Sequence, residues 1–153
     1  MIQKKDIPES KLKYSQTESK ISFTENNRTY YADNSNKKRI LGFRVDGGLI
    51  KSTQTRKCDY ALIVENDLCY LIELKGQDID DACEQLNKTI KIFSDEYDVN
   101  KIVCRIVVSR YNTHKLKSEK HIALERKLRI IQKKFDIKQK SLDIKEKILR
   151  EII

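Results

Sequence analysis

The chain has little of what usually interrupts or cross-links a structure. It contains one proline and four glycines, and neither residue type occurs after Gly76, so nothing breaks the pattern of the C-terminal half. No apolar run approaches the roughly 18 residues that a membrane-spanning helix needs. We therefore expect no membrane association. The charged N-terminus is not followed by an apolar run, so we also expect no secretory signal.

Cysteine and histidine are also sparse, and neither is arranged as metal ligands usually are. The two histidines, His114 and His121, lie in polar stretches, and we expect them at the surface. No Cys-x-x-Cys pair occurs, which argues against a zinc site. Scattered cysteines in mostly apolar runs are typical of reduced, buried thiols in a cytoplasmic protein. They are Cys58, Cys69, Cys83 and Cys104.

Charge, in contrast, is abundant and unevenly distributed. The net charge of the chain is +9, but residues 59–98 alone carry a net charge of −8. Residues 1–58 and 113–153 carry +7 each. Basic flanks suit the phosphate backbone of a nucleic acid, and an acidic centre suits a metal ion. Lysine-rich surfaces also serve solubility alone, so charge by itself leaves both interpretations open.

The length fits one domain, which we divide into three parts. Residues 1–39 form an N-terminal arm, read as loose or as a short helix up to residue 20, followed by a hairpin centred on Asn26 and Asn27. Residues 40–108 form the core, with expected strands at 40–45, 60–64, 68–74 and 101–108. Residues 113–153 form basic C-terminal helices, with a second helix expected to begin near Ser141 because Ile144, Ile148 and Ile152 recur every four residues.

Two acidic residues lie at the ends of two apolar runs, 60–64 and 68–74, that read as a hairpin. If its turn is centred on Asn66, residues whose numbers sum to 132 face each other, and Asp59 faces Glu73. Directly opposed residues of an antiparallel pair have Cβ atoms about 4.5–5.5 Å apart. Two carboxylates that close repel each other unless a cation lies between them. Lys75, two positions beyond Glu73, projects from the same face, so the sequence predicts a site for a hard, oxygen-seeking cation with an ammonium group beside it.

The elements around this hairpin predict an α/β fold with a mixed sheet. Apolar residues from Ile79 to Phe93 recur at steps of three and four, which is typical of an amphipathic helix. Strand, helix and strand in succession imply a right-handed crossover onto a parallel neighbour. Both strands of the hairpin are apolar on both faces, so we expect them to be covered on both sides.

Asp59 and the Glu73-Leu74-Lys75 triplet, in this order of elements, resemble the PD-(D/E)XK nuclease superfamily, which includes restriction enzymes and Holliday-junction resolvases. The resemblance covers about 40–108. Within this range Gln85, on the following helix, resembles the glutamine of some exonuclease-like members. It implies a restriction-endonuclease-like mixed sheet flanked by helices, with a C-terminal helical extension. Many members carry a further acid on an N-terminal helix. Neither that helix nor that acid is evident here, and the weak candidates are Glu9, Glu18 and Glu25.

The resemblance implies a DNA endonuclease, resolvase-like or restriction-like, that hydrolyses phosphodiester bonds. Asp59 and Glu73 would hold Mg²⁺, for which Mn²⁺ may substitute, with the Leu74 carbonyl as a further ligand. Lys75 would position water or stabilise the transition state, and Gln85 would orient a ligand or a phosphate. Gln85 is equally well read as a surface amide.

The implied partners are DNA, with RNA not excluded, and a second copy of the chain. One active site cuts one strand, so a small enzyme that cuts both pairs with itself, here through its C-terminal helices. Basic residues before Asp59 and after the first hairpin would hold phosphates, although the second group is equally well read as a solvated loop. These candidates are Lys51, Arg56, Lys57, Lys37, Lys38 and Arg39.

Other interpretations remain open for several residues. In one of them the acids serve only structure, with Asp59 at a strand end and Glu73 paired with Lys75. The chain would then be a non-catalytic nucleic-acid-binding module on the same fold. Asp46, before two glycines, reads first as a turn residue. Tyr30, Tyr31 and Tyr111 can stack on bases, but sheet packing is the preferred reading.

Overall fold

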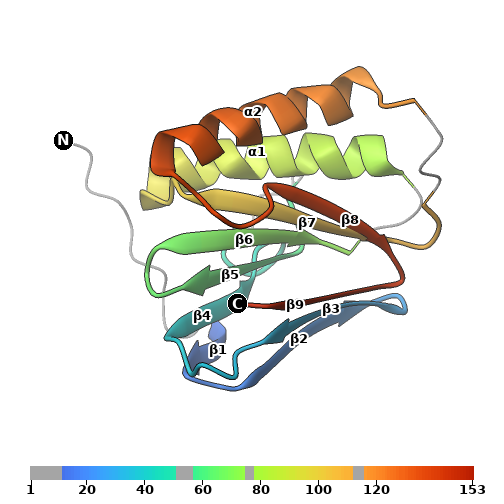
Figure 1. Cartoon of the computed structure of the whole chain (residues 1–153). Coiled ribbons are helices and arrows are strands. Elements are labelled where there is room, and N and C mark those ends of the chain that lie inside the picture. The colour runs from blue at the N-terminus through green and yellow to red at the C-terminus, as the bar shows by residue number, and fades with distance from the viewer. Residues whose placement is uncertain (1–11, 51–56, 75–77, 112–115) are drawn as a thin grey trace.

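The computed structural model describes residues 12–50, 57–74, 78–111 and 116–153. It is a mixed α/β structure of three layers (Figure 1): two helices lie over a six-stranded sheet, and a three-stranded sheet covers the opposite face. The expected α/β class is confirmed. The helices α1 and α2 pack against each other, and both lie on the same face of the large sheet. We expected helices on both faces, and for the described residues this expectation is wrong.

The six-stranded sheet has the order β1-β4-β5-β6-β7-β8. Strands β4 (Ile40–Arg44), β5 (Tyr60–Val64) and β6 (Leu68–Glu73) form an antiparallel meander. Helix α1 (Ile79–Tyr97) then crosses over to β7 (Ile102–Val108), which is parallel to β6 as predicted. Every residue of β5 and β7 is buried, because the helices cover one face of these strands and the second sheet covers the other.

The predicted pairing of β5 with β6 is confirmed. The observed pairs run from Tyr60 with Ile72 to Val64 with Leu68, and every pair sums to 132. The turn places Glu65 and Asn66 in the left-handed region, with φ of 56° and 52°. Asparagine tolerates this conformation better than most residues do, so the turn chemistry and the apolar runs specify the same register.

The N-terminal hairpin is also confirmed. Strands β2 (Lys20–Glu25) and β3 (Arg28–Asp33) pair antiparallel, and Glu25 pairs with Arg28 beside the turn. The two turn residues, Asn26 and Asn27, have φ of 49° and 64°. Positive φ at both positions is typical of the tight turn that matches strand twist.

Three strands differ from the predictions. Leu12–Gln16 forms β1 rather than a loose arm or a helix, and it pairs with β4. The helix expected near Ser141 is instead β8 (Leu142–Glu146) and β9 (Ile148–Ile152), separated by Lys147 at φ 65°. β8 extends the large sheet beside β7, and β9 pairs in parallel with β3 to complete the small sheet. The other predicted C-terminal helix, α2 (Glu119–Phe135), is confirmed.

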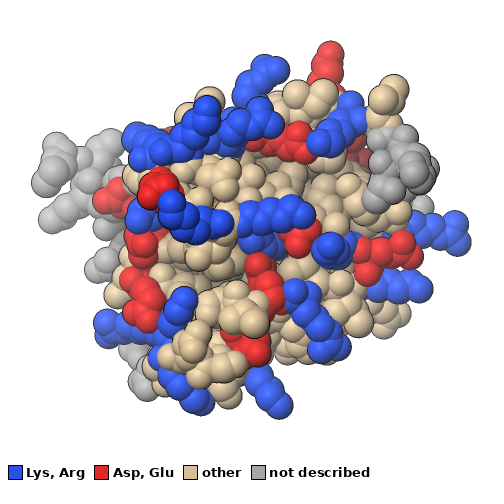
Figure 2. Space-filling model, viewed as in Figure 1, with Lys and Arg blue, Asp and Glu red and all other residues tan. Residues whose placement is uncertain are grey.

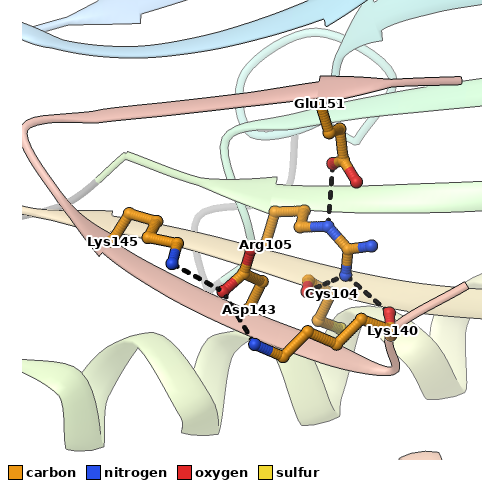
Figure 3. A network of polar contacts seen from close by, with 6 residues as sticks. All are labelled: Cys104, Arg105, Lys140, Asp143, Lys145 and Glu151. Carbon is orange, nitrogen blue, oxygen red and sulfur yellow. Dashed lines mark hydrogen bonds and ion pairs between the residues drawn. The ribbon is translucent and has the colours of Figure 1, made fainter.

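A buried ion pair joins β9 to the large sheet (Figure 3). Arg105 of β7 is 1% exposed, and its Nε donates to Glu151 Oε2 at 2.8 Å. Its Nη1 donates to the carbonyls of Cys104 and Lys140, both at 2.8 Å. The guanidinium also lies over the ring of Tyr70, 5.3 Å from its centroid. These contacts satisfy a buried charge that would otherwise be costly, and they hold the last strand against the core.

Candidate functional site

The candidate site lies at the edge of the large sheet where β6 ends and β5 begins. The observed register, continued by one pair, sets Asp59 across from Glu73. Both side chains are buried, Asp59 at 5% exposure and Glu73 at 0%. The negative charges of both raise the pKa of the Cys58 thiol, in addition to the larger effect of its burial. Both carboxylates therefore lie close enough to Cys58 to act on its thiol.

Glu73 is approached from the helix layer. With its amide nitrogen facing the two acceptors, Gln85 of α1 donates to Glu73 Oε2 at 2.6 Å and to the Lys57 carbonyl at 3.2 Å. Gln85 is 1% exposed, so the reading of it as a surface amide is wrong. One helical turn later, Thr89 accepts from the backbone N–H of Cys58 at 2.9 Å. Helix α1 therefore fixes Glu73 and the entry to β5 together.

Asp59 is approached from the other side. The chain bends at Asp59, and Cys58 and Ala61 both pack in the core beneath the helices. The Asp59 carboxylate accepts from the backbone N–H of Leu74 at 2.8 Å. It also lies beside Glu25, which belongs to the small sheet. The two predicted acids are thus held by different layers of the fold.

Glu25 is the residue that the structure adds to the predicted pair of acids. Burial, followed by the charge and hydrogen bond of Asp59, raises the pKa of Glu25, and Arg44 opposes this shift. Arg44 Nη1 lies 3.0 Å from Glu25 Oε1. Burial is the larger cause of the raised pKa, and the negative charge of Asp59 is the second. Sequence reasoning considered Glu25 among several acids, but only the packing of the small sheet selects it.

A second arginine reaches the same edge. Arg28, the register partner of Glu25, donates from Nη1 to the Leu74 carbonyl at 3.3 Å. Its Nε and Nη2 donate to Ser109 Oγ at 3.0 and 2.6 Å. The carbonyl that the resemblance assigned to a metal therefore already accepts one hydrogen bond, although a carbonyl oxygen has a second lone pair. No sequence pattern indicated Arg28 or Ser109.

The predicted phosphate-binding residues are not gathered at this edge. Lys57 is 2% exposed, so its expected role as an open phosphate contact is wrong. Lys37, Lys38 and Arg39 precede β4, and the Arg39 carbonyl accepts from the backbone N–H of Glu65 in the β5–β6 turn. They therefore lie at the opposite end of these strands from the acids. The remaining candidates, Lys51, Arg56 and Lys75, fall outside the described residues.

Other sequence-based readings have mixed outcomes. His121 is buried at 6% exposure beside Glu125, so the expectation of a surface histidine is wrong, and His114 lies outside the described residues. Tyr30 packs between the sheets as preferred, whereas Tyr31 is 38% exposed. All four cysteines are free and buried, as predicted.

Asp46 is a turn residue, as predicted. Its N–H donates to the Cys58 carbonyl at 3.2 Å, and the glycine that follows it, Gly47, has φ of 75°. A Cβ on the next glycine, Gly48, would lie 2.3 Å from the Arg44 carbonyl oxygen. The two glycines therefore serve a tight turn that leads from β4 toward the segment before β5.

The donor set fits a small hard cation. Carboxylate oxygens from Asp59 and Glu73 and the backbone carbonyl of Leu74 are the ligand types that Mg²⁺ takes, together with water. Among the residues that the structure describes, no group of three or more His, Cys, Asp or Glu side chains is arranged so that it could hold a metal ion.

Comparisons with known proteins give no assignment. No family model, no curated protein and no solved structure matches the chain. Within the described parts of the chain, no helix is both long and apolar enough to cross a membrane.

Proposed function

We propose that the chain is a divalent-metal-dependent DNA endonuclease whose core is like that of the PD-(D/E)XK superfamily. The observation that supports the proposal is the register of β5 with β6, which ends one residue short of Asp59 and Glu73, together with the hydrogen bond from Gln85 of the crossover helix to Glu73. The strand directions support it. The meander β4-β5-β6 followed by parallel β7 is the arrangement that the resemblance implies.

In this proposal Asp59 and Glu73 hold Mg²⁺ or Mn²⁺, and the Leu74 carbonyl supplies a further oxygen. The ion would supply Lewis-acid polarisation of the scissile phosphate and a water of lowered pKa. Gln85 orients the Glu73 carboxylate, and the Leu74 N–H orients that of Asp59. Lys75 stabilises negative charge that develops on the phosphate.

DNA cleavage tests this proposal. The protein is incubated with supercoiled, linear, single-stranded and branched DNA in Mg²⁺, Mn²⁺ or EDTA. We expect cleavage with either metal and none in EDTA. Glu73→Gln should abolish cleavage. Glu96 is an exposed acid of α1, and Glu96→Gln should leave cleavage unchanged. Equal cleavage by the wild type and Glu73→Gln would reject the assignment.

A non-catalytic nucleic-acid-binding module is the second candidate, and the burial of the site favours it. Asp59, Glu73 and Gln85 are at most 5% exposed, and Arg28 and Arg44 bring positive charge to the same edge. Such a set can serve as a structural polar network. Salt-dependent DNA binding without cleavage in every metal, and unchanged by Glu73→Gln, would establish this alternative.

The exposed face of α2 offers a surface for either predicted partner. Ile122 and Ile130 are 41% and 63% exposed, which suits a second copy of the chain. Arg126, Arg129 and Lys133 are exposed on the same helix, which suits the DNA backbone. Figure 2 shows basic side chains along the helix layer at the top of the view. Sedimentation at low and high salt separates binding of DNA from binding of a second copy. Added salt weakens binding to phosphates, whereas it screens the repulsion between like-charged copies and so favours their association.

A further inference from the structure

The hairpin of the small sheet delivers two charged residues to the edge of the large sheet. Its two-residue turn, Asn26-Asn27, holds Glu25 and Arg28 as the last pair of the ladder. Glu25 lies beside Asp59, and Arg28 bonds to the Leu74 carbonyl. The tip is therefore part of the candidate site, although β2 and β3 belong to a different sheet.

Within the part of the chain that the structure describes, the side chain of Arg28 is held in place by neutral groups. Its three hydrogen bonds end on the Ser109 hydroxyl, which accepts two, and on the Leu74 carbonyl. Both acceptors lie just beyond the carboxyl ends of β7 and β6. A guanidinium has five N–H donors, so two have no acceptor among the described residues. The side chain is oriented without all of its donors being used.

Arg28 differs in this from the other arginines near the core. Arg44 pairs with Glu25 at 3.0 Å, and Arg105 pairs with Glu151 at 2.8 Å. Within the described ranges, Arg28 forms no ion pair with any carboxylate. A half-buried guanidinium beside an acidic cluster, without an acid of its own, is a positive charge positioned for an anion that comes from outside.

We propose that Arg28 binds a phosphate group of the nucleic-acid substrate next to the phosphate at Asp59 and Glu73. The inference rests on the proposed function, since it assumes that this edge faces a phosphodiester backbone. Phosphate suits the site because a guanidinium presents paired N–H groups to phosphate oxygens. Ser109 acts as a positioning residue, because its hydroxyl orients Nε and Nη2.

A purely structural role predicts a different outcome. Arg28 would then only clamp the hairpin tip to β6 and β7, and its loss would lower stability without a specific effect on DNA. The number of phosphates contacted separates the two roles, because each contact with duplex DNA contributes about 0.9 to the slope of log affinity against log salt.

The experiment measures binding of a fluorescent 30-base-pair duplex in EDTA over a range of salt, and cleavage in Mn²⁺. The variants are Arg28→Gln, Arg28→Lys and Ser109→Ala. The matched control is Arg150→Gln, an exposed arginine of the same small sheet that lies over Tyr31. Melting of each variant establishes that it is folded.

If Arg28 contacts phosphate, Arg28→Gln weakens binding by roughly 10-fold or more and reduces the salt slope by about 1. Ser109→Ala retains the slope because the charge remains, but it weakens binding by a smaller factor. Arg150→Gln stays within about twofold of wild type. A folded Arg28→Gln with the affinity and slope of wild type overturns the proposal. If Arg28→Gln does not fold, Arg28→Lys decides: weaker binding at an unchanged slope supports the guanidinium contact, and equal affinity overturns it.

The two proposals fail separately. Wild-type protein that binds DNA but cleaves none overturns the nuclease assignment, while the slope of Arg28→Gln still supports or rejects the phosphate contact. Wild-type protein that cleaves equally well with and without Arg28 overturns only the role of Arg28. Absence of any salt-dependent DNA binding by the wild type overturns the phosphate contact.

Discussion

Replacing Asp59 by Asn tests whether Asp59 and Glu73 bind a cation. Asparagine retains an oxygen that can accept from the Leu74 N–H, which now lies 2.8 Å from Asp59 Oδ2. The substitution therefore removes the charge while keeping the hydrogen bond. It also relieves the repulsion between Asp59 and Glu25. We expect the metal-free variant to be at least as stable as the metal-free wild type.

The magnitude of the metal effect follows from linkage. An ion present at ten times its dissociation constant stabilises the folded state by about 1.4 kcal/mol. For a chain of 153 residues this corresponds to a rise in melting temperature of about 3–6 °C. Asp59→Asn removes one of the two carboxylates that would hold the ion in the proposed site, so we expect a rise below about 1 °C at the same concentration.

The pH dependence supplies an independent readout. The pKa of Glu25 in the folded state is raised above 4.5, its value in the unfolded chain. The stability that this shift contributes is therefore fully present at pH values below 4.5. That contribution is lost as pH rises through the folded pKa. Asp59→Asn removes the neighbouring charge and lowers the pKa of Glu25. The fall in stability as pH rises above 4.5 should therefore be smaller in the variant than in the wild type.

The assay is thermal unfolding with increasing Mg²⁺ or Mn²⁺ at constant ionic strength, followed by circular dichroism. Asp95→Asn is the matched control, because Asp95 is an exposed acid paired only with Lys91 among the described residues. It should retain the full metal response. A wild type that shows no response to either metal, or an Asp59→Asn variant that responds as fully as the wild type, would refute the cation-site reasoning.

The remaining predictions concern the structure around the site. Glu151→Gln should lower the free energy of unfolding by about 3 kcal/mol in urea titration, because Arg105, at 1% exposure, loses its ionic partner. Gly48→Ala should destabilise the turn after β4, since its Cβ would lie 2.3 Å from the Arg44 carbonyl oxygen. The four thiols should react with a disulfide reagent only as the protein unfolds, because all are buried and burial raises their pKa, that of Cys83 to about 12.

A specific result would contradict each of these predictions. If Glu151→Gln unfolds at the same urea concentration as the wild type, the pair of Arg105 and Glu151 adds nothing to stability. Gly47→Ala is the control for the turn: a Cβ there meets nothing within 4 Å, so only the cost of φ at 75° remains, about 1–2 kcal/mol. A Gly48→Ala variant more stable than Gly47→Ala would contradict the clash. Fast thiol labelling of the native protein would contradict the burial.

The central hairpin was predictable because its information is local. Two apolar runs separated by Glu65-Asn66-Asp67 allow one register that buries both faces, and the turn residues adopt the positive φ that this register needs. That register ends at Tyr60 and Ile72, so Asp59 and Glu73 are the residues that follow at this end of the two strands. Helix α1 follows in the same way from its periodic apolar residues, and it carries Gln85 to Glu73.

The C-terminal segment was not predictable because its pattern is ambiguous. Ile144, Ile148 and Ile152 are spaced as in a helix, but a spacing of four also fits alternate positions of extended strands. In the structure only Ile144 of the three is buried, and Leu149 and Ile153 face the core instead. The available edges of β7 and β3 decide between the two conformations, and neither edge is visible in the local sequence.

The sequence by itself determined the two strands of the central hairpin, their register and the helix that follows, since neighbouring residues specify the turn, the register and the helical face. Only the tertiary structure decided that the small sheet covers the second face and brings Glu25 and Arg28 to Asp59 and Leu74. The physical reason is that pairing between β3 and β9, and packing of that sheet on the large one, join segments far apart in the chain. Such contacts depend on which strand edges and apolar faces remain uncovered once the local elements have formed.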